Sequence, residues 1–217
     1  MPLTLYAHPF SSYCQKVLVA LYENDLPFAY RTLEEPSAMV ELKARWPFAR
    51  FPVLVDDGRT VVESTIIIEH LMLKHGGRVR WLPDDPLQAL EVRFLDRFFD
   101  NDVMAAMQQP VFEAIRTDNA RKDEAMAQAK QALDVAYGWL EQRLEGRTWA
   151  AGAKMSLADC AAAPSLFYAD WVHPIAATFP TLRAYRSRLL AWPAFARAVN
   201  EARPYRHYFP LGAPDRD

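Results

Sequence analysis

The 217-residue chain has few cysteines, few glycines and little net charge. Its two cysteines, Cys14 and Cys160, are too few for a disulfide framework, so both fit free thiols in a reducing compartment. No run approaches the roughly 18 apolar residues of a membrane span, and no basic and apolar leader precedes the first strand pattern. A net charge of −2 excludes the strongly basic surface typical of nucleic-acid binding. We therefore expect a soluble, cytoplasmic protein that binds neither nucleic acid nor membrane.

Residues 1–80 alternate between short strand patterns and helical patterns. The predicted elements are a strand at Leu3–Ala7, a helix at about Cys14–Asn24, a strand at Phe28–Leu33 and a helix at Ser37–Ala44. This order is that of a βαβ unit followed by a further helix.

A hairpin and a third helix complete the first half. Phe51–Val55 and Thr60–Val62 flank Asp57-Gly58, and Asp-Gly favours a tight turn because glycine tolerates positive φ. Apolar residues then recur at helical spacing after Glu63-Ser64. The first half is therefore predicted as β-α-β-α-β-β-α with a mixed four-stranded sheet.

The second half shows no convincing strand pattern after the Gly76-Gly77 and Leu82–Pro86 breakers. Leu87–Arg116 is predicted as one long helix that Pro110 bends or ends, and Asn119–Leu144 as another. Ser156-x-x-Asp159 has capping-box spacing and predicts the start of a buried helix. Pro180 and Pro193 each stand where a first helical turn begins. We expect an α/β domain at 1–80 and an all-α domain at 86–217.

The segment Ser11–Val17 places a hydroxyl and a thiol where the first predicted helix begins. Unpaired N–H groups and the positive end of the helix dipole stabilise an anion there, such as a thiolate. Ser11 and Cys14 have the spacing of a Cys-x-x-Cys redox motif whose leading cysteine is replaced by serine. The pattern fits a site that holds the thiolate of another molecule, although Ser11 could instead serve only as a helix cap.

These features together resemble the cytosolic glutathione transferase family. The resemblance covers nearly the whole chain and includes a serine-type, zeta-like active-site pattern. It is carried by Ser11-x-x-Cys14-x-Lys16-Val17, Phe51-Pro52-Val53-Leu54, Glu63-Ser64 and Ser156-x-x-Asp159. It implies a thioredoxin-like N-terminal domain, an all-helical C-terminal domain, glutathione as co-substrate and a homodimer.

The resemblance also implies a catalytic role for Ser11. Its O–H would donate to the glutathione sulfur, and a hydrogen bond that favours the charged form lowers the thiol pKa. Ser12 is the main rival, and Tyr6 or Tyr13 could supply a phenolic donor. Cys14 could form mixed disulfides if its own pKa were depressed, or it could pack inward as a small hydrophobic side chain.

Binding of the tripeptide is assigned by the same resemblance. The Phe51-Pro52 peptide bond would be cis, and the backbone of Val53 would pair with the cysteinyl residue of glutathione. Without the resemblance, Pro52 would be an ordinary edge-strand proline. Ser64 would take the γ-glutamyl carboxylate and Glu63 the α-amino group, although Ser64 could also only cap a helix. Arg50 would lie near the glycine carboxylate or remain a solvated surface arginine.

The electrophile pocket is the least specified part of the site. It could be lined by Met104, Met107, Phe112 and Trp171, although such stripes at helical spacing are commonly ordinary core. We predict no metal, because His70 and His75 are five residues apart, which is roughly 140° around a helix.

The sequence therefore predicts a glutathione S-transferase that adds glutathione to a small hydrophobic electrophile. Two alternatives stay open. One is a glutathione-dependent thiol-disulfide reductase or isomerase that uses Cys14, and the other is a non-catalytic binding protein of the same fold.

Overall fold

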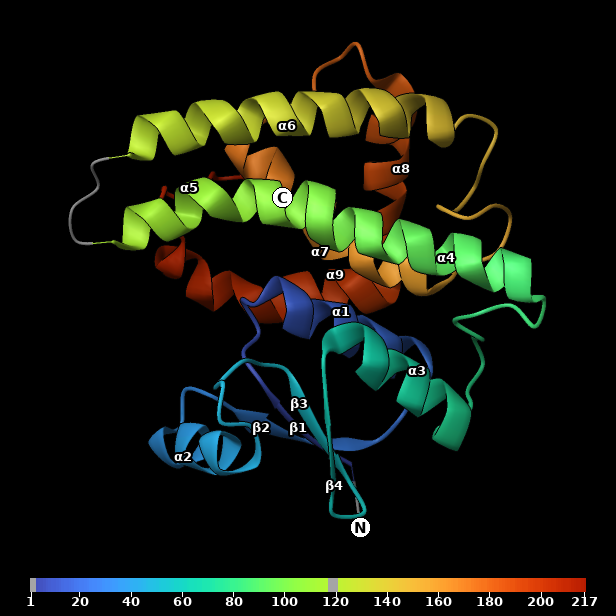
Figure 1. The fold of residues 1–217 in the computed structure, drawn as a ribbon, viewed down its shortest axis with the longest axis vertical. Helices are drawn as coiled ribbons and strands as arrows, with labels where there is room; N and C mark the ends of the chain where they lie inside the picture. Colours follow the sequence, from blue (N-terminus) through green and yellow to red (C-terminus); the bar gives the residue numbers. More distant parts are fainter. Residues whose placement is uncertain (1–2, 117–120) are drawn as a thin grey trace.

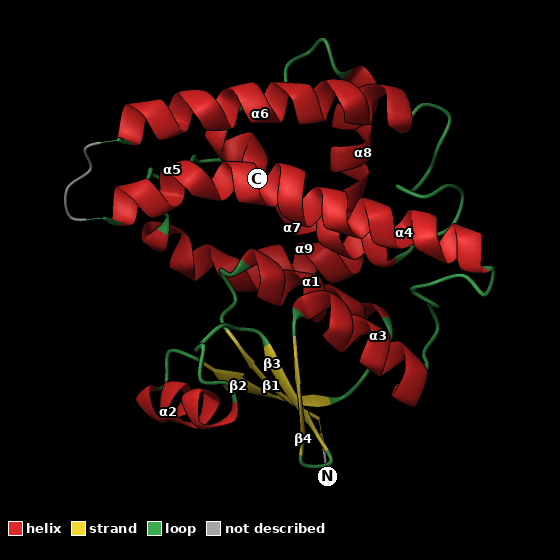
Figure 2. Cartoon of the chain, viewed as in Figure 1, coloured by secondary structure: helices red, strands yellow, loops and turns green. Residues whose placement is uncertain are grey.

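The computed structural model describes residues 3–116 and 121–217. Its first half contains a mixed four-stranded sheet (Figures 1 and 2). The strands are β1 (Leu3–Ala7), β2 (Phe28–Thr32), β3 (Val53–Asp56) and β4 (Arg59–Val62). Their order is β2-β1-β3-β4, with β1 parallel to β2 and antiparallel to β3, and β3 antiparallel to β4. The predicted βαβ unit and hairpin are both confirmed.

Three helices cover the two faces of this sheet. They are α1 (Ser12–Glu23), α2 (Pro36–Arg45) and α3 (Ser64–His75). Because neighbouring side chains of a strand point to opposite faces, Leu5 packs into the core with α1 and α3, whereas Tyr6 packs with α2. The inner strands β1 and β3 are therefore mostly buried, whereas the edge strands β2 and β4 stay partly exposed.

The second half is a layer of helices stacked against α1 (Figure 1). In chain order they are α4 (Pro86–Phe98), η1 (Phe99–Met104), α5 (Ala105–Ile115), α6 (Lys122–Arg143), α7 (Leu157–Val172), α8 (Pro180–Ala191), α9 (Pro193–Ala202) and η2 (Arg203–Tyr208). Pro180 and Pro193 begin α8 and α9 as predicted. Beyond residue 80, the described residues form one isolated bridge, between Trp149 and Gly152, and no longer strand.

The helix predicted at Leu87–Arg116 is continuous but irregular. The irregularity is not an end at Pro110, which lies buried inside α5. Instead the chain forms a π-helical segment, η1, before α5. Such segments insert extra backbone into an α-helix and commonly lie at functional sites. Pro110 cannot donate a backbone hydrogen bond, yet the helix continues through it and the residue is buried.

Helix α7 is the centre of the helical layer. The carboxylate of Asp159 accepts hydrogen bonds from the N–H and hydroxyl of Ser156, at 2.8 and 3.0 Å, which confirms the capping box. All but one residue of α7 are buried, and the helix packs on α1, α4 and η1. One apolar core therefore runs from the sheet into the helical layer.

The division at 1–80 and 86–217 stays a prediction, because that core crosses it. Within the described residues, no helix has both the length and the apolar content needed to cross a bilayer.

Candidate functional site

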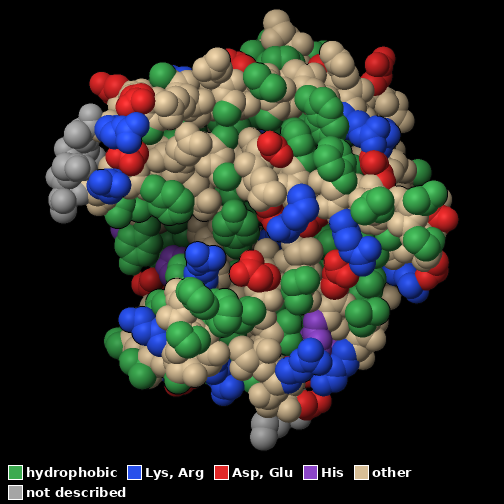
Figure 3. All heavy atoms as spheres, viewed as in Figure 1, with side chains coloured by type: hydrophobic (Ala, Val, Ile, Leu, Met, Phe, Trp, Pro, Cys, Tyr) green, Lys and Arg blue, Asp and Glu red, His purple; other side chains and the backbone are tan. Residues whose placement is uncertain are grey.

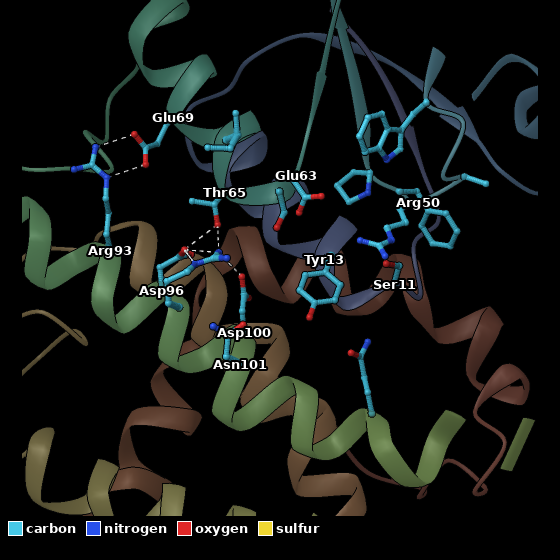
Figure 4. A pocket seen from close by; sticks show the side chains of 18 of the residues that line it. Ser11, Tyr13, Arg50, Glu63, Thr65, Glu69, Arg93, Asp96, Asp100 and Asn101 are labelled. Atoms are coloured by element: carbon cyan, nitrogen blue, oxygen red, sulfur yellow. Dashed lines mark hydrogen bonds and ion pairs between the residues drawn. The ribbon is translucent and has the colours of Figure 1, made fainter. Parts of the chain in front are cut away.

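A cleft of about 1020 Å³ opens between the sheet half and the helical half (Figure 4), and we call it the polar cleft because charged and polar residues predominate among those that line it. On one face of the molecule, acidic and basic side chains gather along the boundary between these halves (Figure 3). The cleft is lined by the start of α1, the loop before β3, the start of α3, and parts of α4, η1 and α5. Among the residues predicted from sequence, it is lined by Ser11, Tyr13, Arg50, Phe51, Pro52, Glu63, Ser64 and Phe112.

A second, mainly apolar cavity of about 480 Å³ adjoins the cleft. Ser11, Phe51 and Gln108 line both spaces. Met107 and Ser12 line only the apolar one, together with side chains from α2, α5 and the C-terminal segment. Ser11 therefore stands where a polar binding space meets an apolar one.

Ser11 is the N-cap of α1, and its Oγ accepts a hydrogen bond from the N–H of Cys14 at 3.4 Å. Its own N–H donates to the carbonyl of His8 at 3.0 Å. The two bonds fix the position of the residue, and accepting a bond at Oγ leaves the hydroxyl hydrogen able to donate. Capping and donation to a ligand are therefore compatible roles for one serine.

The rival donors occupy different places. Ser12 begins α1, is almost fully buried and lines the apolar cavity. The hydroxyl of Tyr6 donates to Glu41 at 2.9 Å, under the other face of the sheet, so Tyr6 does not reach the cleft. Tyr13 lines the cleft, and burial, followed by the charge of Asp100, raises its pKa to about 12. Its phenol is therefore protonated at neutral pH and could donate.

Cys14 lies in the core and not in the cleft. Its side chain is 0% exposed, and burial raises the pKa of its thiol to about 12. The sequence suggested the opposite direction, because a helix N-terminus stabilises a thiolate. Desolvation exceeds that effect here since the side chain points inward, so the inward-packed alternative describes Cys14 and the exchange reaction has no accessible thiolate.

The loop before β3 contributes backbone as well as side chains. The Phe51-Pro52 peptide bond is cis, as the resemblance implied. Val53, however, pairs with Tyr6 of β1 and with Val62 of β4, and it is fully buried. The expectation that its backbone faces a ligand is wrong, because β3 is an inner strand; Phe51, one step outside the strand, lines the cleft instead.

The junction of β4 and α3 forms another wall. Glu63 has a φ of 68°, an uncommon conformation for a residue with a Cβ, and its carbonyl accepts the N–H of Ile67 at 2.8 Å. Glu63 occupies the N-cap position without a side-chain cap bond, and Ser64 is the first residue of the helix. Ser64 is therefore not the cap considered from the sequence. Figure 4 shows Glu63, Tyr13, Arg50 and Ser11 around the same open space.

Two of the four predicted pocket residues lie elsewhere. Met104 is 1% exposed within the core, and Trp171 packs against Phe10, Phe167 and Phe209. Neither lines the cleft or the apolar cavity. The helical spacing that suggested them reflects ordinary core packing, since which side of a helix faces a cavity depends on the elements around it.

The sequence analysis missed a buried ion network under the cleft. Lys16 of α1 is 1% exposed, and its Nζ lies 2.6 Å from Asp96 Oδ1 and 2.8 Å from Asp100 Oδ2. Asp96 also accepts the hydroxyl of Thr65 at 2.8 Å, and Arg97 pairs with both carboxylates. Burial raises the pKa of Asp100, although the charge of Lys16 opposes this. The network joins α1, α3, α4 and η1 at the floor of the cleft. Its signal in the sequence was a lysine within an apolar stretch of helix.

Comparison with known proteins identifies the family of this chain. Family profiles described as glutathione S-transferase N-terminal domain and glutathione S-transferase C-terminal domain match residues 5–79 and 103–193. The chain belongs to the glutathione S-transferase family of enzymes. Its fold is the thioredoxin-like fold of that family, with the helical domain after it.

Three similar proteins illustrate the range of this family. FtsZ-localized protein A of Caulobacter vibrioides is 29% identical over 202 residues, which is 88% of each chain. A probable maleylacetoacetate isomerase of Caenorhabditis elegans is 26% identical over 204 residues, covering 92% of this chain and 94% of the relative. A solved glutathione S-transferase of Methylobacterium radiotolerans, in complex with glutathione sulfonate, is 30% identical with a TM-score of 0.77; the match covers 92% and 95% of the two chains.

Proposed function

We propose that the chain binds glutathione in the polar cleft and adds its thiolate to a small hydrophobic electrophile held in the apolar cavity. The observation that carries this proposal is the position of Ser11, which lines both spaces. A nucleophile held at this junction would meet an apolar substrate without either molecule leaving its own site. Holding both reactants in place converts a bimolecular step into a nearly intramolecular one.

Ser11 would activate the thiol. A free thiol of this kind has a pKa of about 8.5, so most of it is protonated at neutral pH. The Ser11 hydroxyl would donate to the sulfur, while its Oγ keeps the N–H of Cys14. That bond and the start of α1 favour the anion over the neutral thiol, which lowers the thiol pKa. Each pKa unit corresponds to about 1.4 kcal/mol.

The tripeptide would be held by charges at both of its ends. Arg50, exposed at the rim, would pair with the glycine carboxylate. Ser64 and the first turn of α3 would receive the γ-glutamyl carboxylate, and Glu63 its amino group. The backbone of Phe51 and Pro52 would bind the cysteinyl part. The complex of the relative with glutathione sulfonate supports this class of ligand.

The apolar cavity would select the electrophile. Its volume of about 480 Å³ falls within the range of small-molecule sites. Met107 lies on its lining, and Phe112 stands at the neighbouring cleft. A compact apolar substrate fits these surroundings better than a charged one. As part of the same proposal, the chain acts as a homodimer in the cytosol, on the strength of the family resemblance.

Isomerisation is a second candidate, supported by the similarity to the probable maleylacetoacetate isomerase. In that reaction the thiolate adds to a double bond and is later expelled, so glutathione is regenerated. Addition and isomerisation would share Ser11 and the cleft. They differ in whether glutathione is consumed, which a product assay measures directly.

The test compares Ser11→Ala with Ser12→Ala across a panel of electrophiles and cis-alkene acids supplied with glutathione. We expect Ser11→Ala to lower turnover about 100-fold or more, the usual effect of removing one charge-stabilising donor, with little change in glutathione affinity. Ser12→Ala should keep most of the activity. Calorimetry gives the affinity, and the ultraviolet absorbance of bound thiolate against pH gives the thiol pKa.

Other outcomes would change the assignment. Unchanged turnover in Ser11→Ala would move the role to Ser12 or Tyr13. Glutathione binding with no turnover of any panel member by the unaltered protein would favour the non-catalytic alternative.

A further inference from the structure

Three side chains that carry metal-binding atoms meet at the far end of α3, away from the cleft. His70 Nε2 lies 2.7 Å and His75 Nε2 lies 2.9 Å from the same carboxylate oxygen, Oδ2 of Asp56. Asp56 ends β3, whereas both histidines belong to α3. One potential ligand atom from each residue lies within 4.8 Å of the other two.

The sequence analysis argued against this arrangement because the two histidines are roughly 140° apart on a helix. That argument considered only the helix. His75 is the last residue of α3, and Asp56 lies at the hairpin beside it, so both imidazoles turn toward one point. Their ring centroids are 6.4 Å apart. The spacing argument was therefore wrong for this pair.

The surroundings give the carboxylate a fixed orientation. Asp56 is 1% exposed, and its other oxygen, Oδ1, lies 3.0 Å from the ammonium of Lys74. Lys74 also pairs with Asp57 at 2.8 Å, so these three groups together carry one net negative charge. A carboxylate held through its second oxygen resembles the supported ligands of established metal sites.

The histidines leave an approach from solvent. The side chain of His70 is 14% exposed and that of His75 is 27% exposed. Figure 3 shows histidine at the surface beside basic side chains in the region of α3 and β4. Two imidazoles and one carboxylate are ligands that zinc accepts, with a fourth position open to water. Tetrahedral bonds of about 2.0–2.1 Å place donor atoms roughly 3.3 Å apart, so each imidazole nitrogen would move away from Asp56 Oδ2 by about half an ångström.

We propose that Asp56, His70 and His75 form a binding site for a divalent transition-metal ion of the zinc type. Bound metal would join the β3–β4 hairpin to the C-terminal end of α3. The other end of that helix carries Ser64, about 16 Å away at 1.5 Å per residue. The metal would therefore stabilise the wall of the cleft and take no part in the chemistry there.

The experiment uses the full chain without an affinity tag, treated with a chelator and then titrated with Co²⁺. We expect one equivalent to bind and to produce ligand-field absorption in the visible range, which added Zn²⁺ abolishes by displacement. Zn²⁺ should also raise the thermal unfolding midpoint, because a ligand that binds only the folded state stabilises it.

Two variants and a matched control locate the ion. His75→Gln and His70→Gln should each weaken Co²⁺ binding at least tenfold and remove the Zn²⁺ effect on unfolding. The control is His173→Gln, since His173 also contacts one aspartate, Asp134 at 2.8 Å, but without a second histidine. It should bind the metal as the unaltered chain does.

The proposal is overturned by any of three results: no stoichiometric binding to the unaltered chain, equal binding by the His75→Gln protein, or equal loss in His173→Gln. Circular dichroism shows whether each variant is folded. Should His70→Gln fail to fold, the His75→Gln variant alone tests the proposal. His75 is the last residue of α3 and is partly exposed, so its substitution should leave the fold intact. Failure here leaves the Ser11 assay unaffected.

Discussion

At Cys14, burial of the thiol has a larger effect on its pKa than the nearby start of helix α1. The start of α1 would favour a thiolate, yet the side chain is 0% exposed and the pKa of its thiol rises to about 12. A desolvated anion is costly unless it is paired. The raised pKa also affects stability, because a group whose pKa differs between the folded and unfolded chain makes the free energy of unfolding depend on pH.

We predict that Cys14 contributes to a loss of stability at alkaline pH. The unfolded thiol loses its proton near its ordinary pKa of 9.0, while the folded thiol keeps it until about 12. The contribution is therefore complete below about 9 and is lost as pH rises toward 12. Its slope is up to about 1.4 kcal/mol per pH unit.

Urea unfolding of the native chain and of Cys14→Ala between pH 8 and about pH 10 measures this slope, since tyrosine and lysine side chains also titrate above that range. The variant should lose stability less steeply with pH. Equal slopes would mean that folding does not raise the pKa of Cys14, which would revive the thiol-disulfide exchange alternative.

Lys16 is a second residue whose contribution to stability depends on its burial. Its ammonium is buried between Asp96 and Asp100, so removing it leaves two carboxylates without their buried partner. We predict that Lys16→Met destabilises the fold by about 3–5 kcal/mol, the usual cost of breaking a buried ion pair. Denaturant unfolding at neutral pH measures it.

Arg93→Met is the matched control, because Arg93 forms an exposed bidentate pair with Glu69 at 3.0 and 2.9 Å. Exposed pairs contribute little, so its effect should be much smaller. Similar losses in the two variants would contradict the distinction by burial.

At the scale of elements, the start of α7 depends on one carboxylate. Asp159 accepts not only from Ser156 but also from the N–H of Ala150 at 2.8 Å and from the hydroxyl of Tyr185 at 2.6 Å. It therefore ties the preceding loop and α8 to the first turn of α7. A capping box seen in sequence is here the centre of a wider buried network.

We predict a clear ranking of two capping variants. Ser156→Ala should cost about 1 kcal/mol, as for an ordinary cap. Asp159→Ala should cost at least about 2 kcal/mol more, because it leaves the Ala150 N–H and the Tyr185 hydroxyl buried without an acceptor. Urea unfolding monitored by circular dichroism gives both values, and equal costs would show that the additional bonds contribute nothing.

At the scale of the whole molecule, α1 packs on the sheet with one face and on α7 and α9 with the other. Separating the halves would expose both the apolar surface of α1 and the buried charge of Lys16. The halves are distinct in secondary structure and continuous in their core.

We therefore predict a single cooperative unfolding transition. Five of the six tryptophans lie after residue 80, so their fluorescence follows mainly the helical half, whereas circular dichroism follows the whole chain. The two signals should give coincident denaturation curves. A fragment of residues 1–80 alone should not show a sharp transition. Two separated transitions of the full chain would instead support independently stable domains.

Local patterns predicted most elements because each depends on neighbouring residues. Alternation gave the strands, Asp57-Gly58 gave the hairpin, and proline gave the starts of α8 and α9. The π-helical η1 was missed since its extra residue has no local pattern. Pro110 was given too much weight, since α5 continues through it.

The site was only partly accessible to such reasoning. Ser11, Arg50 and Ser64 could be assigned to one cleft because a resemblance linked separated motifs. Val53 and Trp171 were misplaced, because tertiary packing determines which neighbour covers each face of a strand or helix. The Lys16 network and the Asp56 cluster join residues that are distant in sequence, so no spacing rule finds them.

The sequence by itself therefore determined the order of the elements, the capping of α1 and α7 and the family, because these depend on nearby side chains and short motifs. Only the tertiary structure decided which way Cys14 points, which groups share the cleft and which charges meet in the interior. Desolvation and long-range pairing depend on every element around a side chain, and these are established only when the chain has folded.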